Sequence, residues 1–227
     1  MKQKFTILFD LDGTLVDTAP DLMLAHNHVM RKFGYPTKST EDIRNLVGKG
    51  AGALIGRSIW GQAKKEFSKV LDEKIKDEMV KEFVSFYGKN IVNESTLVTG
   101  VKDFLIWCKE ENISMAVCTN KQEHLSNDLL KKIGIYDFFE YVAGSDTFDY
   151  CKPDPRHLTN VVEILDGDIK KTIMIGDSET DANAGKAAEI PVILLENGYT
   201  EKNTTEIYHN HLIKDYVGIE KIISKYL

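Results

Sequence analysis

The feature that most constrains the fold is a set of short apolar runs, each of which ends in small or polar residues and precedes a helical pattern. Four such runs cover residues 6–9, 113–118, 172–175 and 191–195, and a weaker fifth covers 141–143. Continuous apolar strands that alternate with helices are typical of a parallel sheet covered on both faces. The sequence therefore predicts an α/β fold with a doubly wound, Rossmann-like parallel sheet.

A long block after the first run breaks this alternation. Residues 17–93 show helical patterns at 21–33, 40–46 and 72–87 and no convincing strand. The other helical patterns follow the runs, at 101–111, 125–133, 157–165 and 178–188, and an amphipathic stretch covers 217–226. We predict a core domain of residues 1–16 and 94–227 with an all-helical domain of residues 17–93 inserted, joined by connections near 15–20 and 90–99.

Charge and composition narrow the class of partner. The 35 acidic and 29 basic residues give a net charge of −6, which argues against nucleic acid or an anionic membrane as the main partner. No apolar run approaches the roughly 20 residues that cross a bilayer. The three cysteines show no CxxC spacing, which favours a reducing cytoplasm over a disulfide framework. We expect a cytoplasmic monomer or homodimer acting on a small metabolite.

Polar side chains follow three of the predicted strands. In open parallel sheets, ligands bind beyond the carboxyl ends of the strands. We therefore expect three segments to converge on one crevice, namely Asp10-Leu11-Asp12-Gly13-Thr14, Thr119-Asn120-Lys121 and Gly176-Asp177-Ser178.

The acids among these residues imply a cation. Two unit charges 4 Å apart repel by about 4 kcal/mol at an effective dielectric constant of 20, so the carboxylates of Asp10, Asp12 and Asp177 need a counter-charge. Oxygen ligands without a histidine or cysteine companion favour Mg²⁺. Lys152, aimed by the proline that follows it, supplies a fixed positive charge, and Thr119 offers a hydroxyl suited to a phosphoryl oxygen.

Four segments resemble the motifs of the haloacid dehalogenase superfamily. They are Asp10-Leu11-Asp12-Gly13-Thr14-Leu15-Val16-Asp17-Thr18, then Thr119-Asn120-Lys121, Lys152-Pro153-Asp154-Pro155, and Gly176-Asp177-Ser178-Glu179-Thr180-Asp181. They occur in the order of that superfamily and cover the whole predicted sheet domain. The helical insertion is similar to its cap domain.

The resemblance implies a phosphatase that works through a covalent phospho-aspartate. Asp10 would be the nucleophile, and Asp12 would protonate the leaving alcohol and then activate water. Thr119, Asn120 and Lys152 would hold the transferring phosphoryl group. Asp12 speaks against a dehalogenase, because a dehalogenase has no leaving alcohol to protonate.

The same resemblance implies a set of metal ligands. Mg²⁺ would lie on the Asp10 carboxylate, the Asp12 backbone carbonyl and Asp177. Asp181, with Ser178, would orient those ligands from behind. Both residues also fit a helix capping box, and the two roles are compatible.

Substrate choice is expected to depend on residues 44–52 of the insertion. This stretch pairs cations with a flexible loop and resembles the cap loop of phosphoglycolate phosphatases, so Arg44, Gly48 and Lys49 are candidate substrate contacts. The preferred substrate is 2-phosphoglycolate. Pyrophosphate, nucleotides and phosphosugars, the last with a phosphatase or a mutase reaction, stay open.

Each motif also has a simpler interpretation. Asp10 and Asp12 could be turn residues after a strand, and residues 48–52 could be a plain connection between helices. A different class, a receiver-like signalling module, also places a phospho-accepting aspartate, a threonine and a lysine at strand ends. Asp12 and the inserted helical block both count against that class.

Overall fold

The main sheet of the computed structural model, which describes residues 4–66 and 73–227, is parallel throughout. Its strands lie in the order β5-β4-β1-β6-β7-β8. Their bounds are β1 (Thr6–Phe9), β4 (Ser114–Cys118), β5 (Tyr141–Ala143), β6 (Thr172–Gly176), β7 (Val192–Leu195) and β8 (His211–Ile213). The predicted doubly wound α/β fold is therefore confirmed.

Successive residues of the central strand β1 enter two different hydrophobic clusters. Ile7 and Phe9 pack with residues of helix α5 (Val101–Glu110), whereas Leu8 packs on the opposite face with residues of α7 (Arg156–Ile164) and α8 (Glu179–Ala187). This alternation follows from the two-residue repeat of a strand. Because both faces are covered, all four residues of β1 are buried, as a continuous apolar run predicts.

Two short elements near the end of the chain differ from the prediction. Strand β8 was not predicted, because its three residues lie in a polar segment without a recognisable apolar run. The predicted amphipathic stretch of residues 217–226 contains only the four-residue helix α9 (Glu220–Ile223). Gly218 lies just before it with φ +81°, a left-handed conformation that an α-helix cannot contain.

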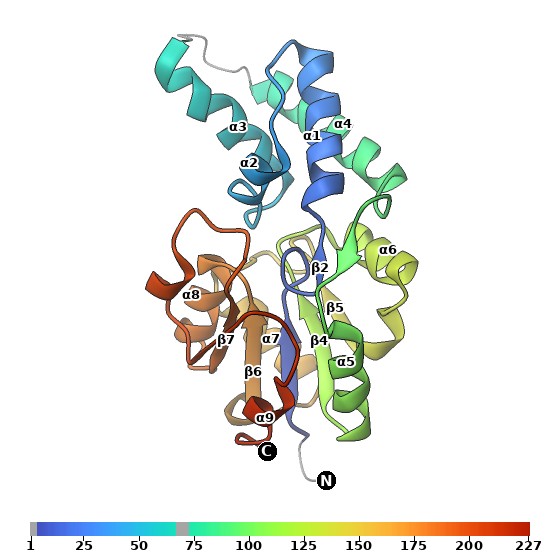
Figure 1. The fold of residues 1–227 in the computed structure, drawn as a ribbon, viewed down its shortest axis with the longest axis vertical. Helices are drawn as coiled ribbons and strands as arrows, with labels where there is room; N and C mark the ends of the chain where they lie inside the picture. Colours follow the sequence, from blue (N-terminus) through green and yellow to red (C-terminus); the bar gives the residue numbers. More distant parts are fainter. Residues whose placement is uncertain (1–3, 67–72) are drawn as a thin grey trace.

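The helices that follow β1 form what we call the helical part: α1 (Ala19–Phe33), α2 (Thr40–Arg44), α3 (Ala51–Glu66) and α4 (Glu73–Lys89). They gather beyond the carboxyl ends of the core strands, at the top of Figure 1, where α4 packs against both α1 and α3. Helix α3 corrects the prediction, because residues 51 and 52 begin a helix instead of continuing a loop. Asp72, where a helix was predicted to begin, lies outside the described residues.

The two connections between the sheet and the helical part are joined to each other. Strands β2 (Val16–Asp17) and β3 (Thr96–Leu97) pair antiparallel, a short ladder that was not predicted. The buried carboxylate of Asp21, in the first turn of α1, accepts hydrogen bonds from the backbone N–H groups of Asn93, Glu94 and Ser95 at 2.9–3.1 Å. This contact clamps the outgoing connection onto the incoming one.

Helix α6 (Glu123–Ile133) follows β4 and ends at a left-handed glycine, Gly134. Within residues 4–66 and 73–227, no helix combines the length and the hydropathy that crossing a bilayer requires.

Candidate active site

Three neighbouring strands, β4, β1 and β6, end at the same edge of the sheet, and a polar residue follows each. Thr119 follows β4, Asp10 follows β1 and Asp177 follows β6. The backbone N–H of Asp10 donates to the carbonyl of Ile175, which fixes the end of β1 against β6 at 2.9 Å. Since β1 lies where the crossovers diverge to the two sides of the sheet, this edge is a topological switch point.

The loop after β1 approaches Asp177 so closely that Gly13 has no room for a side chain. Gly13 has φ +81°, and a Cβ there would lie 2.2 Å from Asp177 Oδ2. Thr14 Oγ1 donates to Asp177 Oδ1 at 3.2 Å, and the backbone N–H of Tyr199 donates to Asp177 Oδ2 at 2.6 Å. The orientation of this carboxylate is therefore set by groups from two other loops.

Carboxylate oxygens of Asp10, Asp177 and Asp181 all lie within 4.8 Å of one another, and all three residues are buried. Burial raises the pKa of Asp10 from its usual 3.8 to about 6, against the lowering effect of Lys152. Burial and the nearby Asp181 raise the pKa of Asp177 well above its usual value. Three buried acids in one cluster, with the pKa values of Asp10 and Asp177 raised, are an arrangement that a cation would stabilise.

The donor set fits a hard divalent ion. The ligand atoms available in the cluster are all oxygens, which suits Mg²⁺ better than a metal that prefers nitrogen or sulfur. Asp10 Oδ1 is buried and receives no well-directed hydrogen bond from the described residues. Asp12 was predicted to contribute through its backbone carbonyl, and its carboxylate stands outside the cluster.

Lys152 provides the fixed positive charge beside these acids. Its Nζ lies 3.0 Å from Asp10 Oδ1 and donates to Asp181 Oδ1 at 2.5 Å, with only 2% of the residue exposed. The carboxylates of Asp10 and Asp181 raise the pKa of Lys152 above its usual value, although burial acts in the opposite direction. The ammonium therefore stays charged in the interior.

Asp181 is held by both of its carboxylate oxygens. Oδ1 accepts from Lys152, while Oδ2 accepts from the backbone N–H groups of Asp177 and Ser178 and from Ser178 Oγ at 2.7–3.2 Å. Ser178 and Asp181 also make the capping box at the start of α8. With its oxygens engaged in this way, Asp181 orients its neighbours, which is compatible with the supporting role predicted for it.

The carboxylate of Asp12 faces a second lysine. Lys121 Nζ donates to both of its oxygens, at 2.7 and 2.8 Å, and Thr18 Oγ1 donates to Oδ1 at 2.7 Å. The same ammonium lies 4.5 Å from the centre of the Tyr87 ring, in helix α4. Asp12 is thus tied to the strand β4 loop and, through Lys121, to the helical part.

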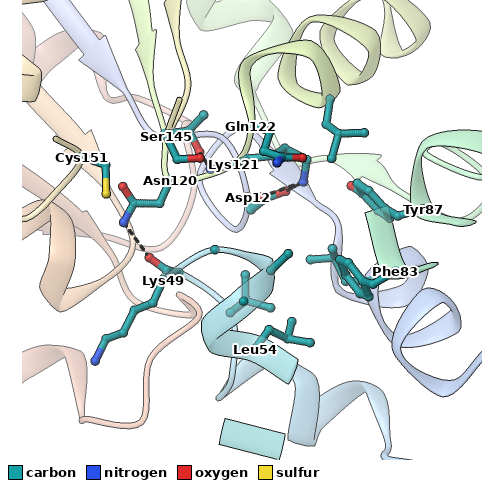
Figure 2. Close-up of a pocket in the computed structure, with 18 of the residues that line it drawn as sticks. Asp12, Lys49, Leu54, Phe83, Tyr87, Asn120, Lys121, Gln122, Ser145 and Cys151 are labelled. Atoms are coloured by element: carbon teal, nitrogen blue, oxygen red, sulfur yellow. Dashed lines mark hydrogen bonds and ion pairs between the residues drawn. The ribbon is translucent and has the colours of Figure 1, made fainter. Parts of the chain in front are cut away.

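Thr119 and Asn120 lie at the junction of core and helical part. Thr119 is 2% exposed. Asn120 Nδ2 donates to the carbonyl of Lys152 at 2.9 Å. It also donates to the carbonyl of Gly48 at 3.1 Å, as Figure 2 shows. Gly48 is therefore brought to the predicted site by its backbone.

A cavity of about 250 Å³ lies between these loops and the helical part. Its core side includes Asp10, Asp12 and residues 119–122, and its other side includes residues 47–52, Leu54, Phe83 and Tyr87. Figure 2 shows the polar groups from the strand ends facing the apolar side chains of α3 and α4. The cavity is shaped to enclose a small polar molecule against the strand ends.

Arg44 does not line this cavity, and its role as a substrate contact stays a prediction. Its guanidinium donates to Asp17 Oδ2 at 2.6 Å and lies 5.3 Å from the centre of the Tyr199 ring, at a separate cavity beside the connections. Lys49 lies at the rim of the cavity beside Asp12 but is exposed, and its side chain extends away from Asp12 and Lys121 (Figure 2). Arg44 and Lys49 were proposed as substrate contacts from their positions in the sequence, which does not indicate where a side chain points.

Three residues at the site had no assigned role in the sequence analysis: Lys121, Tyr87 and Tyr199. Lys121 belongs to a quoted motif, so its position after β4 could have marked it. Tyr87 and Tyr199 sit in segments without a motif, and only the folded chain brings them to the acids. The hydroxyl of Tyr199 makes a short hydrogen bond with Asp17 Oδ1 and accepts from the backbone N–H of Ala19 at 2.8 Å.

Comparison with known proteins agrees with this geometry. The family model described as haloacid dehalogenase-like hydrolase matches residues 7–195. A phosphoglycolate phosphatase of Mesorhizobium japonicum is 36% identical over 210 residues, which cover 92% of this chain and 90% of the relative. A phosphoglycolate phosphatase of Nitrosococcus oceani is 34% identical, and the match covers 99% of both proteins.

A solved structure extends the likeness to three dimensions. The crystal structure of a "predicted phosphoglycolate phosphatase" from Haemophilus somnus 129PT has a TM-score of 0.90 and 30% sequence identity, covering 98% of this chain and 99% of that one. The match includes the sheet and the helices above it. The chain therefore belongs to the haloacid dehalogenase-like hydrolase family and is a phosphatase-type enzyme that resembles phosphoglycolate phosphatases.

Proposed function

We propose that the protein hydrolyses a small phosphate monoester, 2-phosphoglycolate, to glycolate and phosphate, with Mg²⁺ as cofactor and a phospho-aspartate on Asp10. The observation that carries this proposal is the position of Asp10, which is buried beside two further acids and 3.0 Å from the Lys152 ammonium. The names of the relatives support the choice of substrate.

In the first half of the reaction, Asp10 attacks the phosphorus atom and the ester bond to the leaving oxygen breaks. With a pKa of about 6, Asp10 is largely ionised at pH 7 and can act as the nucleophile. Lys152, Thr119 and the N–H groups of the strand-end loops hold the phosphoryl oxygens. Bound at Asp10 and Asp177, Mg²⁺ would neutralise the charge that develops on those oxygens.

Asp12 carries the proton transfers. It gives a proton to the leaving alcohol, and it then takes one from the water that attacks the phosphorus of phospho-Asp10, which releases phosphate and restores Asp10. The position of Asp12, two residues beyond Asp10 and at the wall of the same cavity, supports this role. Asp12 must first loosen its two hydrogen bonds to Lys121.

No single group supplies the rate. Hydrolysis of phosphate monoesters needs accelerations of up to about 10²¹, whereas an acid–base group gives about 10²–10⁴ and one oriented donor about 10²–10³. Nucleophile, acid, ammonium and metal must therefore act together on one phosphoryl group. The convergence of Asp10, Asp12, Lys152 and Asp177 at one sheet edge supports such joint action.

The cavity favours a small substrate. Its volume of about 250 Å³ lies below the range of roughly 300–1,000 Å³ typical of pockets for drug-sized ligands, so a nucleotide or hexose phosphate would need the helical part to move away. We propose that residues 17–93 act as a cap that closes over the substrate and excludes water, with the paired strands β2 and β3 as the hinge.

The test is turnover of 2-phosphoglycolate with Mg²⁺ and after EDTA, beside a panel of pyrophosphate, nucleoside monophosphates and hexose phosphates. We expect hydrolysis that EDTA abolishes and a preference for 2-phosphoglycolate. Asp10→Asn keeps the size of the side chain and is expected to lose at least 10³-fold in kcat (about 4 kcal/mol). Asp154→Asn, which removes the charge of a partly exposed acid next to Lys152 and Pro153, is the matched control and should keep its activity. Undiminished turnover by Asp10→Asn would refute the assignment.

A further inference from the structure

Lys121 is fixed at the wall of the cavity by several contacts. Its side chain is only 6% exposed, its ammonium bonds both oxygens of Asp12, and it lies over the ring of Tyr87 (Figure 2). Its backbone N–H donates to Thr119 Oγ1 at 3.2 Å, and its carbonyl accepts from the N–H of Ser145 at 2.9 Å. These contacts hold the buried Lys121 ammonium in one orientation, so that it can bind an anion in the cavity, unlike a lysine on a solvated face.

The contact with Asp12 conflicts with the reaction. Lys121 occupies both carboxylate oxygens, and Thr18 adds a further hydrogen bond to Oδ1. A leaving oxygen needs one of those oxygens free and facing it. When substrate binds, Lys121 must therefore leave one oxygen of Asp12. Because withdrawing a buried ammonium from its partner is costly, another anion must take the place of that oxygen.

A second group beside Lys121 lacks a partner. The hydroxyl of Tyr87 is buried and has no hydrogen-bond partner within the described part of the chain, although the residue is 1% exposed and lines the cavity. Figure 2 shows the Tyr87 side chain pointing toward Lys121. Burial raises the pKa of Tyr87 well above its usual value, so its hydroxyl keeps its proton and is a donor. A buried donor without a partner is costly unless a ligand satisfies it.

We propose that Lys121 and Tyr87 bind the carboxylate of the substrate, so that the enzyme selects phosphate esters whose leaving alcohol carries a carboxylate on the adjacent carbon. The inference deepens the proposed function and rests on it. In such a substrate the carboxylate carbon lies two bonds from the leaving oxygen, roughly 2.5 Å at bond lengths near 1.5 Å. A leaving oxygen at Asp12 thus brings the carboxylate within reach of the Lys121 ammonium.

Binding and catalysis are linked in this arrangement. The carboxylate takes hydrogen bonds from Lys121 and Tyr87, and one oxygen of Asp12 is released toward the leaving oxygen. The walls near Lys121 include Leu54, Phe83 and Leu125, and such apolar surroundings strengthen an ion pair relative to water. An ester without the carboxylate gains neither effect, because Lys121 then stays on Asp12.

The experiment compares 2-phosphoglycolate with ethyl phosphate, in which a methyl group replaces the carboxylate. Steady-state kcat and KM with Mg²⁺ are measured for the wild-type enzyme and for Lys121→Met, Lys121→Arg and Tyr87→Phe. Lys131→Met is the matched control, since Lys131 is exposed and lies 4.8 Å from the centre of the Tyr136 ring, a contact similar to that of Lys121 with Tyr87.

We expect Lys121→Met to lower kcat/KM for 2-phosphoglycolate by roughly 10- to 100-fold more than for ethyl phosphate, the size of a lost charge-assisted hydrogen bond. The preference is the ratio of kcat/KM for 2-phosphoglycolate to that for ethyl phosphate. Lys121→Arg should retain part of this preference, and Tyr87→Phe should lower it by about 5-fold. Lys131→Met should leave the preference unchanged. In the Asp10→Asn background, calorimetry should show the same selective loss of affinity when Lys121→Met is added.

Equal losses for both esters would overturn the inference and leave Lys121 as a group that only positions Asp12. A preference unchanged in Tyr87→Phe would remove Tyr87 from the site. If the wild-type enzyme hydrolyses neither ester in Mg²⁺, the proposed function itself fails, an outcome distinct from equal losses in an active enzyme.

Discussion

Replacing Lys152 by methionine is expected to destabilise the protein strongly, because it leaves buried carboxylates without their fixed counter-charge. Lys152 Nζ lies 2.5 Å from Asp181 Oδ1 and 3.0 Å from Asp10 Oδ1, and the side chains of all three residues are at most 9% exposed. Removing one partner of a buried ion pair costs about 3–5 kcal/mol. Lys202→Met is the matched control, since Lys202 forms an ion pair with Glu179 at the same 2.5 Å with both side chains largely exposed.

The expected shift in melting temperature follows from the size of the chain. An unfolding entropy of about 2.1 cal/mol/K per residue gives about 0.5 kcal/mol/K for 227 residues, so Lys152→Met should lower Tm by roughly 6–10 °C in EDTA at pH 8. Lys202→Met should produce no measurable shift, since exposed ion pairs contribute little. The loss for Lys152→Met should shrink as the pH falls toward 5, because unpaired buried acids with raised pKa values then bind protons.

Differential scanning calorimetry of both variants and the wild-type protein, without metal, provides the measurement. Adding Mg²⁺ should restore part of the lost stability in Lys152→Met by binding to the folded state. Equal Tm values for Lys152→Met and Lys202→Met would refute the reasoning, since the two pairs differ in burial and not in distance.

Three further outcomes are expected. Gly13→Ala should abolish the Mg²⁺ binding that calorimetry measures, because its methyl group would lie 2.2 Å from Asp177 Oδ2. Gly34→Ala, also at positive φ but with open space around it, is the control and should keep binding. Equal Mg²⁺ affinities of the two variants would refute the prediction. Asp21→Asn should lose about 3 kcal/mol in urea unfolding, because its carboxylate accepts several hydrogen bonds from the outgoing connection, and a loss below about 1 kcal/mol would contradict the clamp. Burial lowers the pKa of His157 from 6.5 to about 4. The free energy of unfolding should therefore fall by about 3 kcal/mol as the pH drops from 6.5 to 4, at 1.36 kcal/mol per pH unit. His157→Phe should remove this part of the acid sensitivity, and an unchanged dependence of stability on pH would disprove the role of His157.

The sheet was predictable because its signal is local. Each buried strand of four or five apolar residues stands out in the sequence, and the rule that ligands bind beyond strand ends places Asp10, Thr119 and Asp177 together. Elements without such a signal were missed. Strand β8 has three residues, and α3 begins within a glycine-rich stretch that is typical of loops.

Side-chain direction could not be predicted in the same way. Arg44 and Lys49 were chosen because cations suit an anionic substrate, yet Arg44 pairs with Asp17 and Lys49 extends to the exterior. Conversely, Lys121 contacts Asp12 across 109 residues of chain, and Tyr87 reaches it from the helical part. Contacts of this range depend on the packing of the helical part on the sheet, which no local pattern encodes.

The central claim is that Asp10 becomes phosphorylated during turnover. The direct measurement is to quench the enzyme in acid while it hydrolyses 2-phosphoglycolate, reduce any acyl phosphate with borohydride, and locate the product by peptide mass spectrometry. We predict homoserine at position 10 in samples with Mg²⁺ and substrate, and unmodified aspartate there when EDTA is present. Turnover with position 10 unmodified, or homoserine at position 12 or 177 instead, would contradict the claim.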